Sequence, residues 1–154
     1  MVRMSDLAAE ERERFQSRKF AALPGEPFVR PPALDKARLA IVTTAGLQRR
    51  SDRAFDIRTG DYRVIPGEVE GRDLVMSHSS SNFDRTGFQQ DVNIAFPIDR
   101  LREMERAGEI GSLGRFHYSF MSAFAQLSDF EPAAREVAGM LKRDAVDAVL
   151  LTPV

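Results

Sequence analysis

Short apolar runs that alternate with longer amphipathic segments are the clearest pattern in the sequence. A continuous apolar run closed by small or polar residues is typical of a strand that is buried on both faces. This pattern predicts buried strands at residues 39–42, 74–76 and 149–151, and a further strand at residues 116–120. The segment DYRVIPG, residues 61–67, predicts a short strand or an extended loop, because Pro-Gly ends it.

Two amphipathic segments between these runs predict helices. The first begins at Pro97, whose ring suits the first helical turn, and ends near Gly108, which can adopt a left-handed conformation. The second begins at Asp129, a suitable N-cap, has Pro132 in its first turn, and continues to about residue 144. Both helices place apolar side chains at helical spacing toward the interior: Ile98, Leu101 and Met104 in the first, and Val137, Met140 and Leu141 in the second.

The alternation of strands and helices predicts the fold class. It is typical of a parallel sheet with right-handed crossovers, so we expect an α/β fold over residues 37–154. We expect a single parallel-sheet, three-layer domain of the Rossmann or flavodoxin-like kind. Residues 1–36 predict an N-terminal helical arm, with a charged helix at about 6–20 followed by a proline-rich extended segment. This arm either wraps a second subunit or is a partly ordered tail.

Composition narrows the possible functions. The 154 residues include 22 Lys or Arg and 23 Asp or Glu, and a net charge of −1 gives no electrostatic case for nucleic acid binding. The sequence contains no cysteine, which excludes disulfides, thiolate metal sites and a cysteine nucleophile within these residues. No apolar run approaches the ~20 residues of a membrane span. The N-terminus also lacks the apolar core of a secretory signal, so we expect a cytoplasmic protein.

Candidate site residues gather where the predicted strands end. Ligands of parallel α/β sheets bind beyond the carboxyl ends of the strands, and here these ends carry Thr43, Thr44, Phe120 and Met121. The long segment after residue 76 adds the polar candidates His78, Ser79, Ser80, Asp91 and Asn93. A neutral imidazole at His78 could hold a nucleophile or donate a proton near pH 7. In the alternative interpretation, these small polar residues only satisfy the backbone groups of loops.

The remaining motifs carry weaker functional signals. No G-x-S-x-G elbow accompanies the serines beside His78, which argues against a Ser-His-Asp hydrolase. The segment TAGLQRRSD, residues 44–52, lacks the glycine spacing of a nucleotide-binding loop. Arg49, Arg50 and Arg53 either bind an anion or form a solvated basic face. His117 alternates with aromatic residues on a predicted strand and is interpreted as structural.

Several segments, taken in order, resemble one known family. They include LAIVTTAGLQRRSDRAFD at residues 39–56, MSHSSSNFDRTGFQQDVNIAFPIDRLREM at residues 76–104, and DAVLLTPV at residues 147–154. This combination of a histidine loop, D-x-N, P-I-D-R-L and a closing strand resembles the glycine/sarcosine/betaine/D-proline reductase selenoprotein B family. The similarity runs from about Arg38 to Val154, and its closest likeness is to the B subunit of D-proline reductase.

The resemblance implies a redox role for the end of the last strand. In the family a selenocysteine or cysteine follows this strand directly, so the nucleophile is expected immediately after Val154. In the reductases of this family the selenolate cleaves a carbon–nitrogen bond of a substrate that is activated on a partner's pyruvoyl group, and dithiols regenerate it. The resemblance implies that the full-length protein reduces a small-molecule substrate, with a partner reductase subunit or a thiol reductant as the expected partner. This form would be inactive, because its nucleophile is absent. An in-frame UGA codon read as stop, or a deliberate truncation, would explain an end at Val154.

The resemblance also implies roles for individual residues. His78 would steer protons across the crevice from the nucleophile, Asp91 and Asn93 would shape the loop, and Asp99 and Arg100 would anchor it to the following helix. The expected substrate-binding residues are Thr43, Thr44, Ser79, Ser80, Asp91, Asn93, Phe120 and Met121. No cofactor or metal is expected within this chain; selenocysteine is expected in the full-length protein.

Two other functions are compatible with the residues. A binding or assembly subunit without chemistry of its own would form a homo-oligomer through the arm at residues 1–36. A different enzyme would use His78 together with carboxylates and a metal.

Overall fold

The computed structural model describes residues 3–17, 25, 28–56, 58–79, 85–121 and 127–154. The chain divides into two compact units, Met1–Arg30 and Pro31–Val154. The first unit contains a 3₁₀ turn, η1 (Met4–Asp6), and one α-helix, α1 (Ala9–Gln16). The guanidinium of Arg12 donates to the carbonyls of Met4, Ser5 and Leu7 and so joins the turn to the helix. The charged helix expected from residue 6 therefore begins three residues later.

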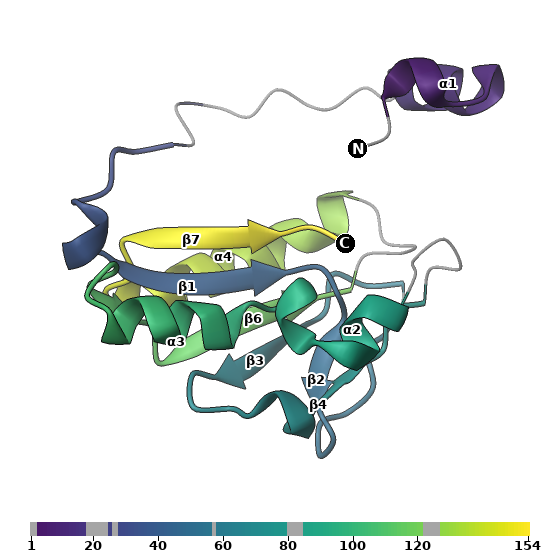
Figure 1. Ribbon diagram of the computed structural model, residues 1–154. Coiled ribbons are helices and arrows are strands. Elements are labelled where there is room, and N and C mark those ends of the chain that lie inside the picture. The colour runs from purple at the N-terminus through teal and green to yellow at the C-terminus, as the bar shows by residue number, and fades with distance from the viewer. Residues whose placement is uncertain (1–2, 18–24, 26–27, 57, 80–84, 122–126) are drawn as a thin grey trace. The chain divides into compact units, whose positions relative to one another are not determined.

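The second unit is built on a sheet with β1 (Arg38–Thr43) at its centre. β1 pairs in parallel with β5 (Ser112–Leu113), β6 (Phe116–Phe120) and β7 (Ala148–Thr152). β3 (Tyr62–Pro66) pairs with β6 in the antiparallel direction. The sheet is therefore mostly parallel, and the expected α/β fold is confirmed (Figure 1).

The predicted strand at residues 74–76 is present as β4 (Leu74–Met76), but it lies outside the parallel sheet. It pairs with β2 (Leu47–Arg49) in a separate antiparallel two-stranded sheet. The chain leaves β1 through Gly46, whose positive φ of 65° turns the backbone into β2. Because β2 starts immediately after this turn, β4 finds its partner there, and its expected place in the parallel sheet was wrong.

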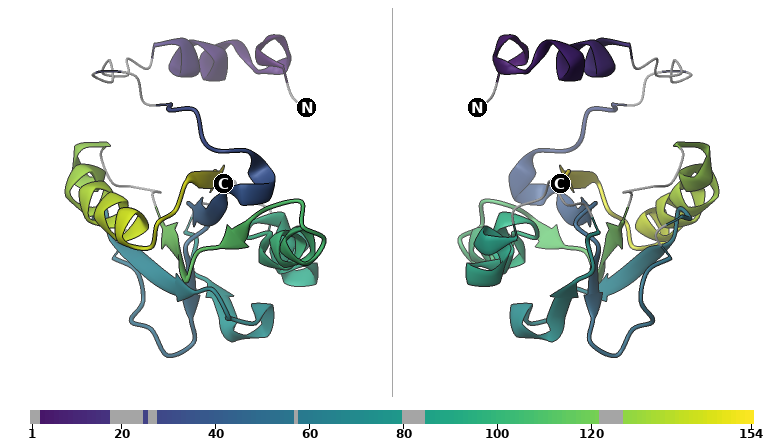
Figure 2. Two further views of the ribbon diagram at one scale, coloured as in Figure 1. Left: turned by 90° about the vertical axis from the view of Figure 1, so that its left-hand side faces the viewer. Right: turned by 90° about the vertical axis from the view of Figure 1, so that its right-hand side faces the viewer.

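Helices cover both faces of the sheet, as Figure 2 shows. On one face α3 (Ile98–Arg106) buries Ile98 and Leu101 against Ile41 of β1. On the other face α4 (Leu127–Arg143) buries Val137 against Tyr118 and Phe120 of β6. This arrangement confirms the three-layer expectation. α4 begins two residues before Asp129, so Asp129 lies in the first turn and is not the N-cap.

Short helical segments connect the main elements. They are η2 (Leu34–Lys36), η3 (Gly71–Asp73), α2 (Thr86–Gln90) and η4 (Val92–Ile94). The last two lie within the long segment that separates β4 from α3, and they deliver Ala95 and Phe96 to the core, where both are buried.

The prediction of a strand near the end of the chain is confirmed in β7, but its predicted burial was wrong. Val149, Leu150 and Leu151 are 38%, 37% and 64% exposed. β7 pairs with β1 on one side, and among the residues that the structure describes no strand pairs with its other side. An apolar run alone does not distinguish a central strand from an edge strand, because both can carry the same residues.

Candidate active site

The carboxyl ends of β1, β6 and β7 meet at one edge of the sheet (Figure 1). The hydroxyl of Thr43 lies within hydrogen-bond distance of two carbonyl oxygens, 3.2 Å from that of Ala95 and 3.1 Å from that of Thr152. The hydroxyl of Thr152 donates to the same Ala95 carbonyl at 3.0 Å. The two threonines therefore join the ends of β1 and β7 to the loop that precedes α3.

Thr44 holds the chain beyond β7. Its N–H donates to the carbonyl of Thr152 at 3.2 Å, which continues the parallel ladder by one step. Its hydroxyl oxygen then accepts the N–H of Val154 at 2.9 Å and lies 3.5 Å from the carbonyl oxygen of Val154. A side chain thus takes over the pairing where the strand ends, so the direction of the backbone at Val154 is fixed by Thr44.

His78 lies beside the end of β1 and is only 5% exposed. The N–H of Ser77 donates to the carbonyl of Gly46 at 2.8 Å. A Cβ atom on Gly46 would lie 2.9 Å from Cγ of Met121 and 3.1 Å from the backbone N of His78. The turn after β1, the end of β4 and the end of β6 are therefore packed against one another, and only glycine fits between them.

The environment of His78 favours the neutral imidazole. Burial lowers the pKa of His78 below its ordinary value of 6.5, and the positive charge of Arg85 lowers it further. The guanidinium of Arg85 also donates to the carbonyl of His78. Ser79 lies next to this group, with its hydroxyl 3.6 Å from the sulfur of Met121. A neutral imidazole at this edge can accept a proton near pH 7.

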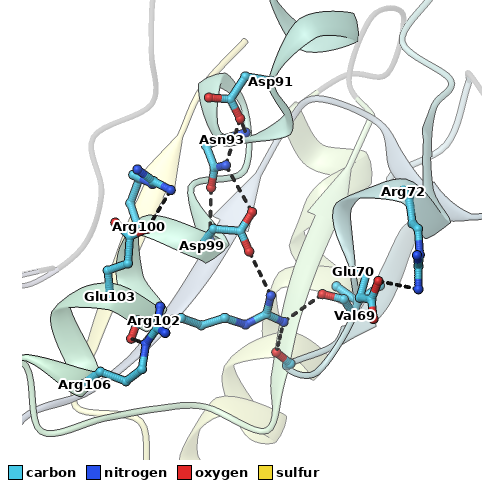
Figure 3. A network of polar contacts seen from close by, with 11 residues as sticks. Val69, Glu70, Arg72, Asp91, Asn93, Asp99, Arg100, Arg102, Glu103 and Arg106 are labelled. Atoms are coloured by element: carbon cyan, nitrogen blue, oxygen red, sulfur yellow. Dashed lines mark hydrogen bonds and ion pairs between the residues drawn. The ribbon is translucent and has the colours of Figure 1, made fainter.

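A second group of predicted residues forms the network of polar contacts in Figure 3. The carboxylate of Asp91 accepts the backbone N–H of Asn93 at 2.9 Å and its side-chain N–H at 2.8 Å. These hydrogen bonds lower the pKa of Asp91. The amide oxygen of Asn93 accepts the N–H of Asp99 at 3.0 Å, and its nitrogen donates to the carboxylate of Asp99 at 3.2 Å. D-x-N and P-I-D-R-L are therefore one unit in which Asn93 caps α3.

Arg102 anchors this unit to the rest of the domain. Its guanidinium donates to the carboxylate of Asp99 at 2.9 Å and to the carbonyls of Gly67 and Val69 at 2.7 Å each (Figure 3). Arg100 instead forms an exposed ion pair with Glu103 at 2.7 Å. The family resemblance implied this anchoring role for Arg100. The i, i+3 spacing from Asp99 to Arg102 was the signal that could have found the correct arginine.

The predicted site residues thus fall into two places. Thr43, Thr44, His78, Ser79 and Met121 gather at the edge of the sheet. Asp91, Asn93 and Asp99 line an open cleft of about 570 Å³ that also includes Arg50, Arg72 and Arg102. Phe120 packs on Tyr62 and Phe130 in the core between β6 and α4. Ser80 lies outside the described residues.

His117 has a structural role, as its position on the predicted strand indicated. The ring is fully buried, and its Nδ1 atom accepts the N–H of Ile41 at 3.0 Å. Burial, and then the positive charge of Arg102, lower the pKa of His117 to about 4. The ring meets Phe96 edge-on, with 5.6 Å between the ring centroids.

The described part of the chain contains neither a cluster of metal-ligating side chains nor a membrane-spanning helix. No group of three or more His, Asp or Glu side chains is placed there to hold a metal ion. No helix there is both long enough and apolar enough to cross a membrane.

Comparison with known proteins identifies the family. The sequence model of the glycine/sarcosine/betaine reductase selenoprotein B family matches residues 13–154. The chain belongs to this family. The match includes both the residues at the edge of the sheet and the unit of Asp91, Asn93 and Asp99. No solved structure matches the chain.

The curated relatives of the family are longer than this chain. D-proline reductase subunit gamma of Acetoanaerobium sticklandii is 37% identical over 117 residues, which are 74% of this chain and 47% of that protein. Betaine reductase complex component B subunit beta of Peptoclostridium acidaminophilum is 32% identical over 125 residues, 77% of this chain and 28% of that protein. Glycine reductase complex component B subunit gamma of Symbiobacterium thermophilum is 30% identical over 141 residues, which are 86% of this chain and 32% of that protein. The chain spans less than half the length of these relatives.

Proposed function

We propose that this chain forms the amino-terminal part of a reductase subunit that acts on a small amine or amino acid. The names of the relatives support the substrate class, since they are reductases of D-proline, betaine and glycine. We further propose that a selenocysteine or cysteine follows Val154 and is the reacting group. A chalcogenide at this position supplies the nucleophile for reductive cleavage of a carbon–nitrogen bond, and a dithiol supplies the two electrons.

The observation that carries this proposal is the bond between the Thr44 hydroxyl and Val154 at 2.9 Å. It fixes the backbone at the position where the resemblance expects the nucleophile to begin. The neutral, buried His78 lies against Gly46 in the turn that follows β1, which supports its proposed part in moving protons. Thr43 and Thr152 position this edge through the Ala95 carbonyl. A reducing compartment such as the cytoplasm suits a mechanism that depends on dithiols.

In this proposal the unit of Asp91, Asn93 and Asp99 positions the loop and does not contact the reacting atoms. Most of its hydrogen-bonding capacity is directed at its own backbone and at Arg102. Asp91 remains exposed on the open cleft. In this proposal Ser79, which is half-buried beside His78, contacts the substrate, whereas Met121 is fully buried and does not.

The proposal predicts that the chain of 154 residues has no reductase activity of its own, because it contains no cysteine. Purified chain incubated with dithiothreitol and D-proline, glycine, sarcosine or betaine should release no reduced product. Dithiol-dependent turnover by this chain would refute the proposed nucleophile.

The DNA beyond codon 154 gives an independent test. We expect a UGA codon followed in frame by a cysteine codon three positions downstream. A different stop codon, or no cysteine codon at that position, contradicts the proposal. If the expected codons are present, the longer protein should lose at least tenfold in kcat on His78→Gln, with a changed pH profile. Arg100→Gln, which removes only an exposed ion pair, should leave kcat unchanged.

A further inference from the structure

Three arginines lie at or just beyond the end of β2, and two of them pair with carboxylates. The guanidinium of Arg49 lies 3.0 Å from the carboxylate of Asp52, and that of Arg53 lies 3.1 Å from the carboxylate of Asp61. The guanidinium of Arg50 makes no ion pair and no hydrogen bond with any residue that the structure describes. The charge of Arg50 is therefore available to a ligand.

Arg50 lines the open cleft of about 570 Å³, and the other charges around this cleft nearly all cancel. Arg72 pairs with Glu70 at 2.7 Å, and Arg102 pairs with Asp99 at 2.9 Å (Figure 3). The cleft then retains one positive charge, that of the arginine after β2. Among the described residues that line it, one negative charge also has no ion pair, and it belongs to Asp91.

The carboxylate of Asp91 is held in one orientation. Its Oδ1 atom accepts both the backbone N–H and the side-chain N–H of Asn93, at 2.9 Å and 2.8 Å (Figure 3). Its Oδ2 atom makes no hydrogen bond within the described residues. The bonds from Asn93, and also the positive charge of Arg100, lower the pKa of Asp91, so the group is ionised at neutral pH. Arg100 itself pairs with Glu103 at 2.7 Å.

The cleft also contains apolar surface. Leu74 is buried, and Phe88 and Val92 are half-buried and pack against the core of the domain. The backbone N–H of Arg50 donates to the carbonyl of Asp73 at 3.3 Å, so the point from which the arginine side chain extends is fixed beside Leu74. An unpaired cation, an oriented anion and an apolar surface therefore line one cleft.

We propose that this cleft binds a small zwitterionic amino acid with an apolar body. The ligand carboxylate pairs with the guanidinium of Arg50, its ammonium donates to the Oδ2 atom of Asp91, and its carbon chain contacts Leu74, Phe88 and Val92. A ligand with a single charge leaves one of the two protein charges without a partner, so it binds more weakly.

This site differs from the proposed place of the reacting group. None of the described residues that gather at the edge of the sheet lines the cleft. The proposal concerns binding alone and goes beyond the proposed redox chemistry. Its test needs no nucleophile, so its failure would leave the proposed reductase function standing.

Calorimetric titration of the chain with 6-aminohexanoate and with leucine tests the proposal. These two probes are isomers that differ in the distance between their charges. At least one of them should bind with a dissociation constant of about 1 mM or below. Hexanoate and pentylamine, which each carry only one of the two charges, should bind at least fivefold more weakly. An absence of binding by both isomers at about 10 mM, or equal binding by a probe with one charge, would overturn the proposal.

Three variants and one spectroscopic signal locate the bound probe. Arg50→Gln and Asp91→Asn should each weaken binding at least fivefold with an unchanged circular dichroism spectrum, because the new amide at position 91 can still accept from Asn93. Arg53→Gln removes only the exposed pair with Asp61 and should leave binding unchanged. The NMR signal of the Asn93 side-chain amide should move when the probe binds. Unchanged binding in Arg50→Gln and Asp91→Asn, or an unmoved Asn93 signal, would overturn the proposal.

Discussion

The Nδ1 atom of His117 accepts the backbone N–H of Ile41 at 3.0 Å, so a side chain fills a place in the parallel ladder. β1 pairs with β5 at Leu39 and with β6 from Val42 onward, and the segment between β5 and β6 interrupts the ladder in between. Without the imidazole, the N–H of Ile41 would be buried without a partner. Such a loss costs about 1–3 kcal/mol.

This bond predicts that acid destabilises the domain before its carboxylates protonate. The pKa of His117 is about 4 in the folded chain, whereas its ordinary value, which applies to the unfolded chain, is 6.5. The unfolded chain therefore binds the proton more tightly. The stability from neutral His117 is therefore complete above pH 6.5 and is lost as the pH falls toward 4, by about 3 kcal/mol in total. Urea denaturation at pH 7, 5.5 and 4.5 measures this loss.

His117→Asn is the matched variant, because an amide oxygen can accept the same N–H and does not titrate. It should be less stable at pH 7 and should show a flatter pH dependence between 6.5 and 4. His78 also has a lowered pKa and adds to the slope in the same direction, so the comparison is made between the variant and the unmodified chain. An unchanged slope in His117→Asn would contradict the prediction.

The second prediction concerns Arg102, which donates to Asp99, Gly67 and Val69. Arg102→Gln removes the ion pair and cannot reach all three acceptors, so the free energy of unfolding should fall by about 2–3 kcal/mol. Arg100→Gln removes an exposed pair on the same helix and should cost less than about 0.5 kcal/mol. Equal effects in the two variants, measured by urea denaturation, would show that Arg102 is not the anchor.

The third prediction concerns the turn after β1. Gly46→Ala adds a Cβ atom at a φ of 65°, 2.9 Å from Cγ of Met121 and 3.1 Å from the backbone N of His78. We expect a loss of about 2–4 kcal/mol from backbone strain together with overpacking.

Gly108→Ala is the control for this turn, because φ there is 73° and nothing lies within 4 Å of the added Cβ. It should cost about 1 kcal/mol, the strain alone. Thermal unfolding measures both variants, and the NMR signals of His78 should move only in Gly46→Ala. A Gly108→Ala variant as unstable as Gly46→Ala would contradict the packing argument.

The fourth prediction concerns the shared carbonyl of Ala95. Thr152→Val keeps the shape of the side chain but removes its 3.0 Å hydrogen bond, so the free energy of unfolding should fall by about 1 kcal/mol. Hydrogen exchange of the loop before α3 should accelerate, because β7 no longer holds it. Thr152→Ser retains the hydroxyl and should keep loop protection near its original level; equal loss in both variants would argue against this contact.

The sequence predicted the α/β class, the helix at Ile98–Arg106 and the strands around Leu39 and Tyr118, because apolar periodicity reports burial directly. It did not predict β2, whose residues LQR are too few to form a pattern. It placed β4 in the wrong sheet, since strand pairing depends on the turn at Gly46 and not on the composition of β4.

The candidate site was predictable to a similar degree. Residues at strand ends converged as expected, because parallel strands end at one edge. The roles within the D-x-N and P-I-D-R-L unit were harder to predict: two arginines, Arg100 and Arg102, follow Asp99, and only the direction of the helix decides which one faces Gly67. The exposure of Leu151 also depends on what lies beside β7, which its own residues do not encode.

The bond from Ile41 to His117 also determines which ring nitrogen of the neutral imidazole carries its single N–H proton. A neutral ring that accepts at Nδ1 must carry its hydrogen on Nε2, so His117 is held in a single tautomer. That Nε2 atom is buried and makes no hydrogen bond in the structure. A ring held in this way cannot relay a proton from one nitrogen to the other. Of the two histidines in the chain, His78 is therefore the one available for proton transfer.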